Sequence, residues 1–165
     1  MNTKSVSKLM CVGGLLVAAV SNTQAASISL NPLTSQVQVG NNFSVELLMN
    51  FSDEATLGGG LDVNYDSTYA DFVSFTFNSS FLSMSDPYMT CPGSGACPPI
   101  DQFNSVQNIA FGNFAGIGGS FTIGTLVFTA LNSGNISLAT AATTGVAGPF
   151  VSAVTYAPMN VTFKG

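Results

Sequence analysis

Groups that could activate a nucleophile are scarce in this sequence. The chain of 165 residues has no histidine, and its three basic residues are Lys4, Lys8 and Lys164. A serine nucleophile needs a neighbouring base, most often histidine, to take its proton. Glycoside hydrolysis needs two carboxyl groups about 5 to 9.5 Å apart, and the aspartates show no recognisable arrangement of that kind: Asp62, Asp66, Asp71, Asp86 and Asp101. The sequence therefore predicts a protein that is not an enzyme.

Asp62, Asn64 and Asp66 carry oxygen atoms at alternate positions, as the opening of an EF-hand calcium loop does. The remainder of that loop is missing, because Ser67 stands where it needs glycine and Val73 where it needs glutamate. On a β-strand the same spacing places the three side chains on one solvated face. We therefore expect a polar surface here and predict no cofactor. A calcium site of another geometry and a partner-binding patch stay open as alternatives.

Cys91 and Cys97 flank a short loop that is rich in glycine and proline. A metal site would need further thiols or histidines, which the chain does not offer there. In an oxidising compartment the two thiols should form a disulfide, and closing so short a loop would contribute about 2 kcal/mol. The sequence predicts a Cys91–Cys97 disulfide.

The first 25 residues have the features of an export signal. Lys4 and Lys8 precede an apolar run over residues 9–20, and Thr23-Gln24-Ala25 resembles a cleavage site. An apolar run of about 12 residues is shorter than the roughly 20 needed to span a membrane. We expect a signal peptide over 1–25, one domain over 26–165, no membrane span, and a secreted or extracellular protein; the periplasm or cell surface are alternatives.

The predicted mature chain is acidic and poor in charge. Its one lysine and eight acidic residues give a formal charge of −7, and charged residues make up 7% of the whole sequence. Such a surface repels nucleic acid and anionic lipid, so both are excluded as partners. Sugar sites often stack a ring on Trp or Tyr; the chain has no Trp, and Tyr88 in the cysteine loop is the candidate stacking residue.

Alternating apolar and polar residues, punctuated by Gly, Asn, Pro and Asp, predict an all-β fold without long helices. Leu61, Val63 and Tyr65 should face the interior, with Asp62 and Asn64 facing solvent. We expect residues 78–104 to form a long loop and residues 113–119 a hairpin connection. About nine short strands imply a two-sheet antiparallel β-sandwich, with strands over 28–30, 36–39, 42–50, 58–65, 71–77, 105–112, 120–131, 136–140 and 153–163.

The order of several short motifs resembles the cohesin modules of extracellular polysaccharide-degrading systems. Residues 39–45 (VGNNFSV) are similar to the V-G-x-x-F-x-V entry of cohesins, and residues 59–66 (GGLDVNYD) to their G-x-x-x-x-x-Y-D strand and turn. Segments 109–112 and 124–128 lie where that family has its fifth and sixth strands. The resemblance implies a nine-stranded jelly-roll sandwich, related to cellulose-binding modules, that attaches to dockerins without catalysis. Gly58 and Gly60 depart from it, because dockerin-binding cohesins carry polar contact residues there.

Together these observations predict a secreted, non-catalytic, cohesin-like module that binds an extracellular polysaccharide or a dockerin-like protein. Outward polar groups can form hydrogen bonds to such a partner at a small desolvation cost. The candidate binding face consists of Asp62, Asn64, Asn108 and Asn113. The alternative is a structural subunit of a surface fibre or biofilm matrix, in which uncovered strand edges pair between copies.

Overall fold

Strands form nearly all of the structure, a computed structural model that describes residues 25–85, 100–102 and 104–165. One helix of a single turn interrupts them. The elements are β1 (Ser27–Pro32), β2 (Asn42–Tyr65), β3 (Ala70–Phe77), α1 (Ser79–Leu82), β4 (Ile100–Gln102), β5 (Ser105–Ala130), β6 (Leu138–Ala142), β7 (Val151–Ser152) and β8 (Thr162–Phe163). The predicted all-β fold is confirmed, with eight strands in the described residues.

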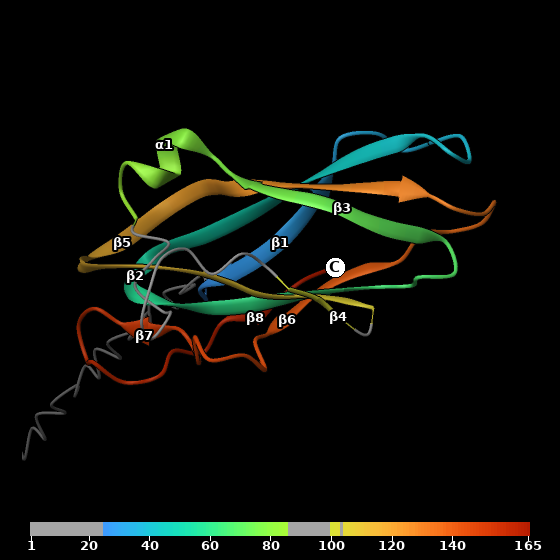
Figure 1. The fold of residues 1–165 in the computed structure, drawn as a ribbon. Helices are drawn as coiled ribbons and strands as arrows, with labels where there is room; N and C mark the ends of the chain where they lie inside the picture. The colour runs from blue at the N-terminus through green and yellow to red at the C-terminus, as the bar shows by residue number, and fades with distance from the viewer. Residues whose placement is uncertain (1–24, 86–99, 103) are drawn as a thin grey trace, which may run out of the picture.

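Two long strands, β2 and β5, pair antiparallel along almost their whole length and fold over together into two layers (Figure 1). In one layer the order is β3-β5-β2-β1-β8. In the other layer, β4 pairs with the first part of β5, and β6 pairs with the last part of β2. The sandwich is therefore one hydrogen-bonded sheet curled onto itself, closed at the bend of β2 and β5 and open at the opposite end.

Glycines allow β2 and β5 to bend without ending. Gly58, with φ +131°, lies against Gly112 so closely that a Cβ on it would be 2.4 Å from the carbonyl oxygen of Phe111. Gly116 and Gly119 also have positive φ, which glycine adopts without steric cost. The predicted breaks within these strands, including the hairpin connection over 113–119, are wrong, because the glycines turn the strand pair and do not reverse the chain.

Two other predicted strands differ from the structure. Residues 36–39 form no strand, and the predicted strand over 153–163 is reduced to β8, which pairs parallel with β1. Tyr156 has a left-handed backbone (φ 58°), and Pro158 forms an isolated bridge to Val151. A left-handed residue interrupts an extended strand, and proline lacks the N–H that a ladder needs.

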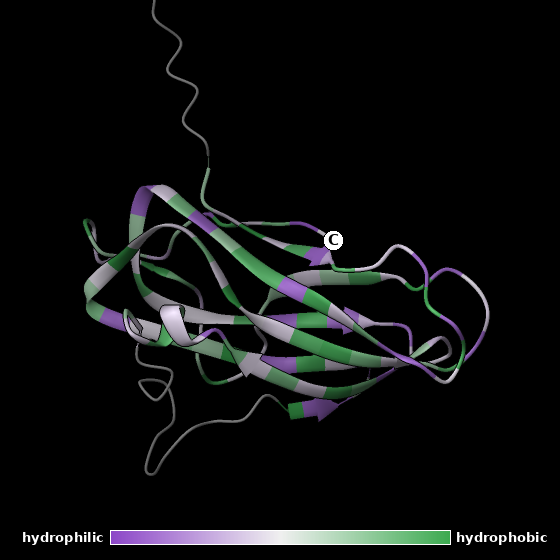
Figure 2. Ribbon diagram, turned by 90° about the horizontal axis from the view of Figure 1, so that it is seen from above, coloured by the Kyte–Doolittle hydropathy of each residue, from purple (hydrophilic) through white to green (hydrophobic). Residues whose placement is uncertain are grey.

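The period-two pattern buries one side of the first half of β2 and of the end of β5, and Figure 2 shows alternating bands along the ribbons. Leu61, Val63 and Tyr65 are buried, as predicted. Toward the open end, Phe128 contacts the rings of Phe43, Tyr65 and Phe72 at centroid distances of 5.3–5.7 Å. Toward the bend, a second aromatic group fills the interior: Phe51, Phe81, Phe111 and Phe150.

Several predictions concern residues outside those that the structure describes. The signal peptide lies outside them apart from Ala25, and so do Cys91, Cys97 and Tyr88. The disulfide, the stacking tyrosine and the domain limits therefore stay predictions. Across the described ranges, no helix combines the length and the apolar character that crossing a membrane requires.

Candidate functional site

The four residues of the predicted binding face do not form one exposed surface. Asn64 is exposed, but Asp62 and Asn108 retain only 3% and 5% of their accessible surface. Asn113 is partly buried, and its Nδ2 donates a hydrogen bond to the carbonyl oxygen of Met84 at 2.8 Å. The expectation that Asp62 and Asn108 face solvent is wrong, because another segment of the chain packs over them.

That segment is the strap, residues 143–149, which follows β6 and covers the outer face of β2. The Asp62 carboxylate accepts four hydrogen bonds, two on each oxygen. Oδ1 accepts from the backbone N–H of Asn108 (2.9 Å) and from Thr143 Oγ1 (2.7 Å). Oδ2 accepts from the backbone N–H (2.9 Å) and the hydroxyl (3.1 Å) of Thr144. A buried carboxylate without a basic partner is tolerated when hydrogen bonds satisfy its oxygens, so Asp62 serves as the anchor of the strap.

Gly60 leaves space for the strap, and Asn108, which has a left-handed backbone conformation, binds it. A Cβ on Gly60 would lie 2.6 Å from Ala147 Cβ, so only glycine leaves the space the strap occupies. Asn108 has φ 61°, and its Oδ1 accepts a hydrogen bond from the backbone N–H of Ala147 at 3.3 Å. Asn tolerates this backbone region better than most residues. In the sequence, the only sign of the strap is the run of glycines that ends at Gly60, because a strand without side chains leaves room for another segment to pack on it.

A second carboxylate also has a structural partner. The Tyr65 hydroxyl donates to Asp101 Oδ1 at 2.6 Å, which joins β2 to β4. Burial raises the pKa of Tyr65 above its ordinary value of 10, and the hydrogen bond to Asp101 and the negative charge of Asp101 raise it further. Tyr65 therefore stays protonated, and the pair holds the edge of the sheet in place.

The aspartates do not gather into a metal centre within the described ranges. Asp62 turns toward the strap, whereas Asp66 Oδ1 accepts a hydrogen bond from the backbone N–H of Thr68 in the turn that follows β2. Over the same residues, His, Cys, Asp and Glu nowhere gather in a group of three that could hold a metal ion. Asp62 and Asp66, which resemble the opening of a calcium loop in the sequence, therefore have separate structural roles: Asp62 binds the strap and Asp66 the turn after β2.

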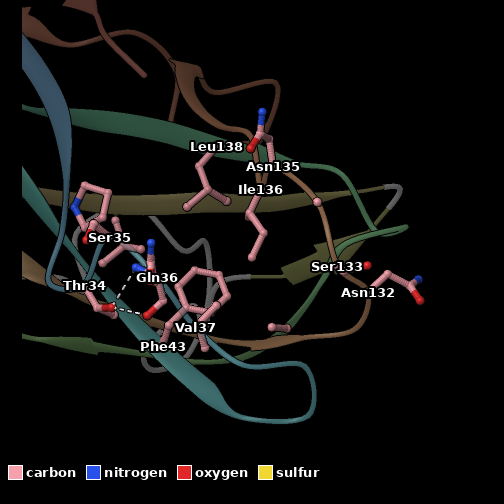
Figure 3. Close-up of a pocket in the computed structure, with 14 residues that line it drawn as sticks. Thr34, Ser35, Gln36, Val37, Phe43, Asn132, Ser133, Asn135, Ile136 and Leu138 are labelled. Atoms are coloured by element: carbon pink, nitrogen blue, oxygen red, sulfur yellow. Dashed lines mark hydrogen bonds between the residues drawn. The ribbon is translucent and has the colours of Figure 1, made fainter.

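A cleft of about 640 Å³ lies at the open end of the sandwich. We call it the end cleft. Two loops form its rims, residues 33–41 between β1 and β2 and residues 131–137 between β5 and β6, as Figure 3 shows. Phe43 and Ile136 point toward one another from opposite walls. Other apolar side chains complete the interior: Val37, Val45, Ala130 and Leu138.

The rims of the end cleft are polar and carry no charge. Their hydroxyl and amide side chains are all exposed: Thr34, Ser35, Gln36, Asn132, Ser133 and Asn135. No Asp, Glu, Lys or Arg is among the residues that line the cleft. None of these positions had been singled out from the sequence, because the cleft joins two loops almost 100 residues apart and neither loop contains a recognisable motif.

Hydrogen bonds hold both rims in place. The backbone N–H of Gly40 donates to the carbonyl of Ala130 at 2.7 Å, and the N–H of Ala130 donates to the carbonyl of Asn41 at 3.0 Å. On the other rim, Asn132 Nδ2 donates to the carbonyl of Thr68 at 2.6 Å. The Tyr69 ring packs against Gly134, where a Cβ would lie 2.5 Å away. The cleft is thus a preformed part of the fold.

No protein-family model matches the sequence, and no curated protein matches it either. Solved structures do resemble the fold. The sixth cohesin of scaffoldin B from Acetivibrio cellulolyticus, solved in complex with a Cel5 dockerin mutant, is 13% identical with a TM-score of 0.56, over 85% of this chain and 96% of that one.

Two further cohesins give the same result. A non-cellulosomal cohesin from the archaeon Archaeoglobus fulgidus is 11% identical with a TM-score of 0.57, over 85% of this chain and 88% of that one. A type I cohesin–dockerin complex from Clostridium thermocellum gives 10% identity and a TM-score of 0.53, over 84% and 96% of the two chains. The predicted resemblance is confirmed at the level of the fold: this chain folds as a cohesin-like β-sandwich.

Proposed function

We propose that this protein is a secreted, non-catalytic module that attaches to a polysaccharide or to a dockerin-like protein outside the cell. The observation that carries the proposal is the preformed end cleft, whose lining has no charged residue. In addition, the carboxylates of Asp62 and Asp101 accept hydrogen bonds that hold the fold together. Such a surface can hold a neutral partner through contacts and hydrogen bonds. The cleft lining contains no Asp, Glu, Lys or Arg that could act as a base on that partner, and His, Cys, Asp and Glu form no group of three in the described residues.

The dockerin alternative is supported by the similar structures, since two of them were solved as complexes with dockerins. A protein that approached the β4-β5-β2-β6 layer of this chain would meet the strap. The strap presents Thr144 and Val146 to solvent, with Val146 71% exposed. Beside the strap, Asn64 is the one predicted face residue that is fully available. We therefore expect a protein partner to contact the strap and Asn64, with Asp62 acting beneath them.

A capture experiment tests the proposal. The protein, expressed as the full chain and purified after export, is immobilised and exposed to the extracellular fraction of the source organism. Bound proteins are then identified by mass spectrometry and bound glycans by sugar analysis. We expect a saturable partner that is recovered chemically intact. Failure to retain any protein or glycan, or release of cleaved products, would contradict the proposed function.

A second candidate function, a structural subunit of a fibre or matrix, is favoured by exposed apolar residues at the bend. Phe114 in β5 is 84% exposed, and Val154 and Tyr156 beyond β7 are 73% and 76% exposed. Ala153, the residue before Val154, packs against Gly116, which is two residues from Phe114. This contact brings the segment of Val154 close to that of Phe114. Exposed apolar groups of this kind favour association. Concentration-dependent assembly in sedimentation velocity, abolished by Phe114→Ser, would support this function, and a monomer at all concentrations would exclude it.

A further inference from the structure

We propose that the end cleft is a binding site for a neutral oligosaccharide, an inference that rests on the proposed function and names the ligand of its cleft. The cleft has about 640 Å³, which lies within the range of pockets that hold small ligands, roughly 300–1,000 Å³. That volume is large enough for a short stretch of a glycan chain. Because the cleft is open at the end of the sandwich, a longer chain could continue out of it on either side.

Charge decides which chemical class the cleft can accept. A phosphorylated, sulfated or carboxylated ligand would bring anionic groups into a site whose lining contains no Lys or Arg and whose parent chain has a net charge of −5. A cationic ligand would meet no Asp or Glu in the lining. Burying a charge without a partner costs far more than burying a hydroxyl that finds a hydrogen bond. The lining therefore selects a ligand that is polar and uncharged.

The distribution of polar and apolar groups matches a sugar more closely than a wholly apolar ligand. A pyranose presents C–H groups on its faces and hydroxyls around its edge, so it needs an apolar wall and a polar rim together. Ile136 and the exposed 7% of Phe43 supply apolar contacts that face one another, as Figure 3 shows. Gln36, Ser35 and Asn135 line the rim with both donors and acceptors. A purely apolar ligand would form no hydrogen bond with these rim groups.

Two rim amides are free to bind a ligand. Within the described residues, the side chains of Gln36 and Asn135 take part in no hydrogen bond to protein, although the backbone of Gln36 is held by Thr34 Oγ1 at 3.2 Å. The Asn132 side chain, in contrast, is already used to fix its loop. Because the loop backbones are held in place, little ordering cost remains for binding, and preorganisation of this kind strengthens affinity.

The test is a titration of the isotope-labelled protein, expressed as the full chain, with cello-, xylo- and mannohexaose, followed by NMR and calorimetry. Hexagalacturonate serves as the charged counterpart. We expect at least one neutral hexasaccharide to shift the amides of residues 34–37 and 131–137, with no binding of hexagalacturonate. The paired change Gln36→Ala and Asn135→Ala should weaken binding about tenfold, as expected for two lost hydrogen bonds.

Matched controls remove amides of the same kind outside the cleft. Gln38→Ala lies in the same loop but does not line the cleft, and Gln102→Ala lies in β4, exposed and outside the cleft lining. Both should bind as the unmodified protein does, and all variants should keep its melting temperature.

Four results would overturn the inference. The first three are that no neutral hexasaccharide binds, that shifts lie only on the strap and Asn64, and that the Gln36 and Asn135 variant binds normally. Preferential binding of an unstructured peptide in the cleft would also overturn it. If the capture experiment still retains a partner, the proposed function stands without this site; if no partner is retained, the proposed function fails as well.

Discussion

Replacing Asp62 with alanine should destabilise the protein, although the same residue had the sequence signature of a solvent-facing binding group. The backbone N–H of Asn108 is buried, and Asp62 Oδ1 is its acceptor at 2.9 Å. A buried donor left without an acceptor costs roughly 1–3 kcal/mol, so this atom alone accounts for about 2 kcal/mol. Thr143 Oγ1 and the backbone N–H of Thr144 would also lose a charged acceptor.

The loss at the strap should be smaller than the loss at Asn108, because the side of the strap at Thr144 is exposed and water can replace the carboxylate. We assign it about 1 kcal/mol, which brings the total for Asp62→Ala to about 3 kcal/mol. For a domain of this size, that corresponds to a fall in melting temperature of about 9 °C. Asp62→Asn retains one acceptor oxygen and should lose about half as much.

Urea unfolding followed by circular dichroism measures these differences, and hydrogen exchange at the Thr144 and Ala147 amides shows whether the strap has loosened. Asn64→Ala is the matched control, because Asn64 lies two residues further along β2 and is exposed; it should change stability by less than about 0.5 kcal/mol. The reasoning is refuted if Asp62→Ala is as stable as the control, or if exchange in the strap is unchanged.

Three further predictions test other parts of the structure. Gly58→Ala should lower the free energy of unfolding in urea by several kcal/mol, because its Cβ would meet the Phe111 backbone at 2.4 Å. Gly40→Ala is the control: Gly40 also has positive φ but no atom lies within 4 Å of its Cβ position, so the loss should be only about 1 kcal/mol. Equal losses would contradict the role of Gly58 in the bend. Phe128→Ala should cost about 3–5 kcal/mol by emptying the centre of three aromatic contacts, and a loss below about 1 kcal/mol would show that the core is not centred there. Since the pKa of Tyr65 is raised above its unfolded value of 10, its protonated form contributes stability that is complete below pH 10 and is lost as the pH rises toward the folded pKa. Tyr65→Phe should therefore flatten the decline in stability above pH 10, and an unchanged decline would assign it to other groups.

Local patterns predicted the strands and the core, but not how the chain covers its own surface. Alternation identified Leu61, Val63 and Tyr65 as buried because the period of two is a property of the strand itself. The same rule placed Asp62 outward, which is its direction from the strand. Its burial comes from the strap, about 80 residues further along the chain, and no local pattern reports such a contact. Burial of a charged residue also runs against the general tendency of aspartate.

The end cleft could not be predicted for a related reason. Its walls come from a loop before β2 and a loop after β5, and the residues concerned, such as Gln36 and Asn135, are ordinary loop residues by composition. Only the closure of the two layers brings them to one end of the sandwich. The bends in β2 and β5 were missed because glycine has two uses, in a turn and at a close approach of two backbones. The sequence alone does not distinguish them.

The central claim, attachment without chemistry, is tested most directly by measuring retention and turnover in one experiment. The purified protein is incubated with insoluble cellulose, xylan and mannan, and bound protein and newly formed reducing ends are measured over time. The account predicts that the protein is retained saturably on at least one of these neutral polysaccharides while reducing ends stay at the level of a protein-free control. Steady release of reducing ends that is lost on changing a single aspartate would contradict it.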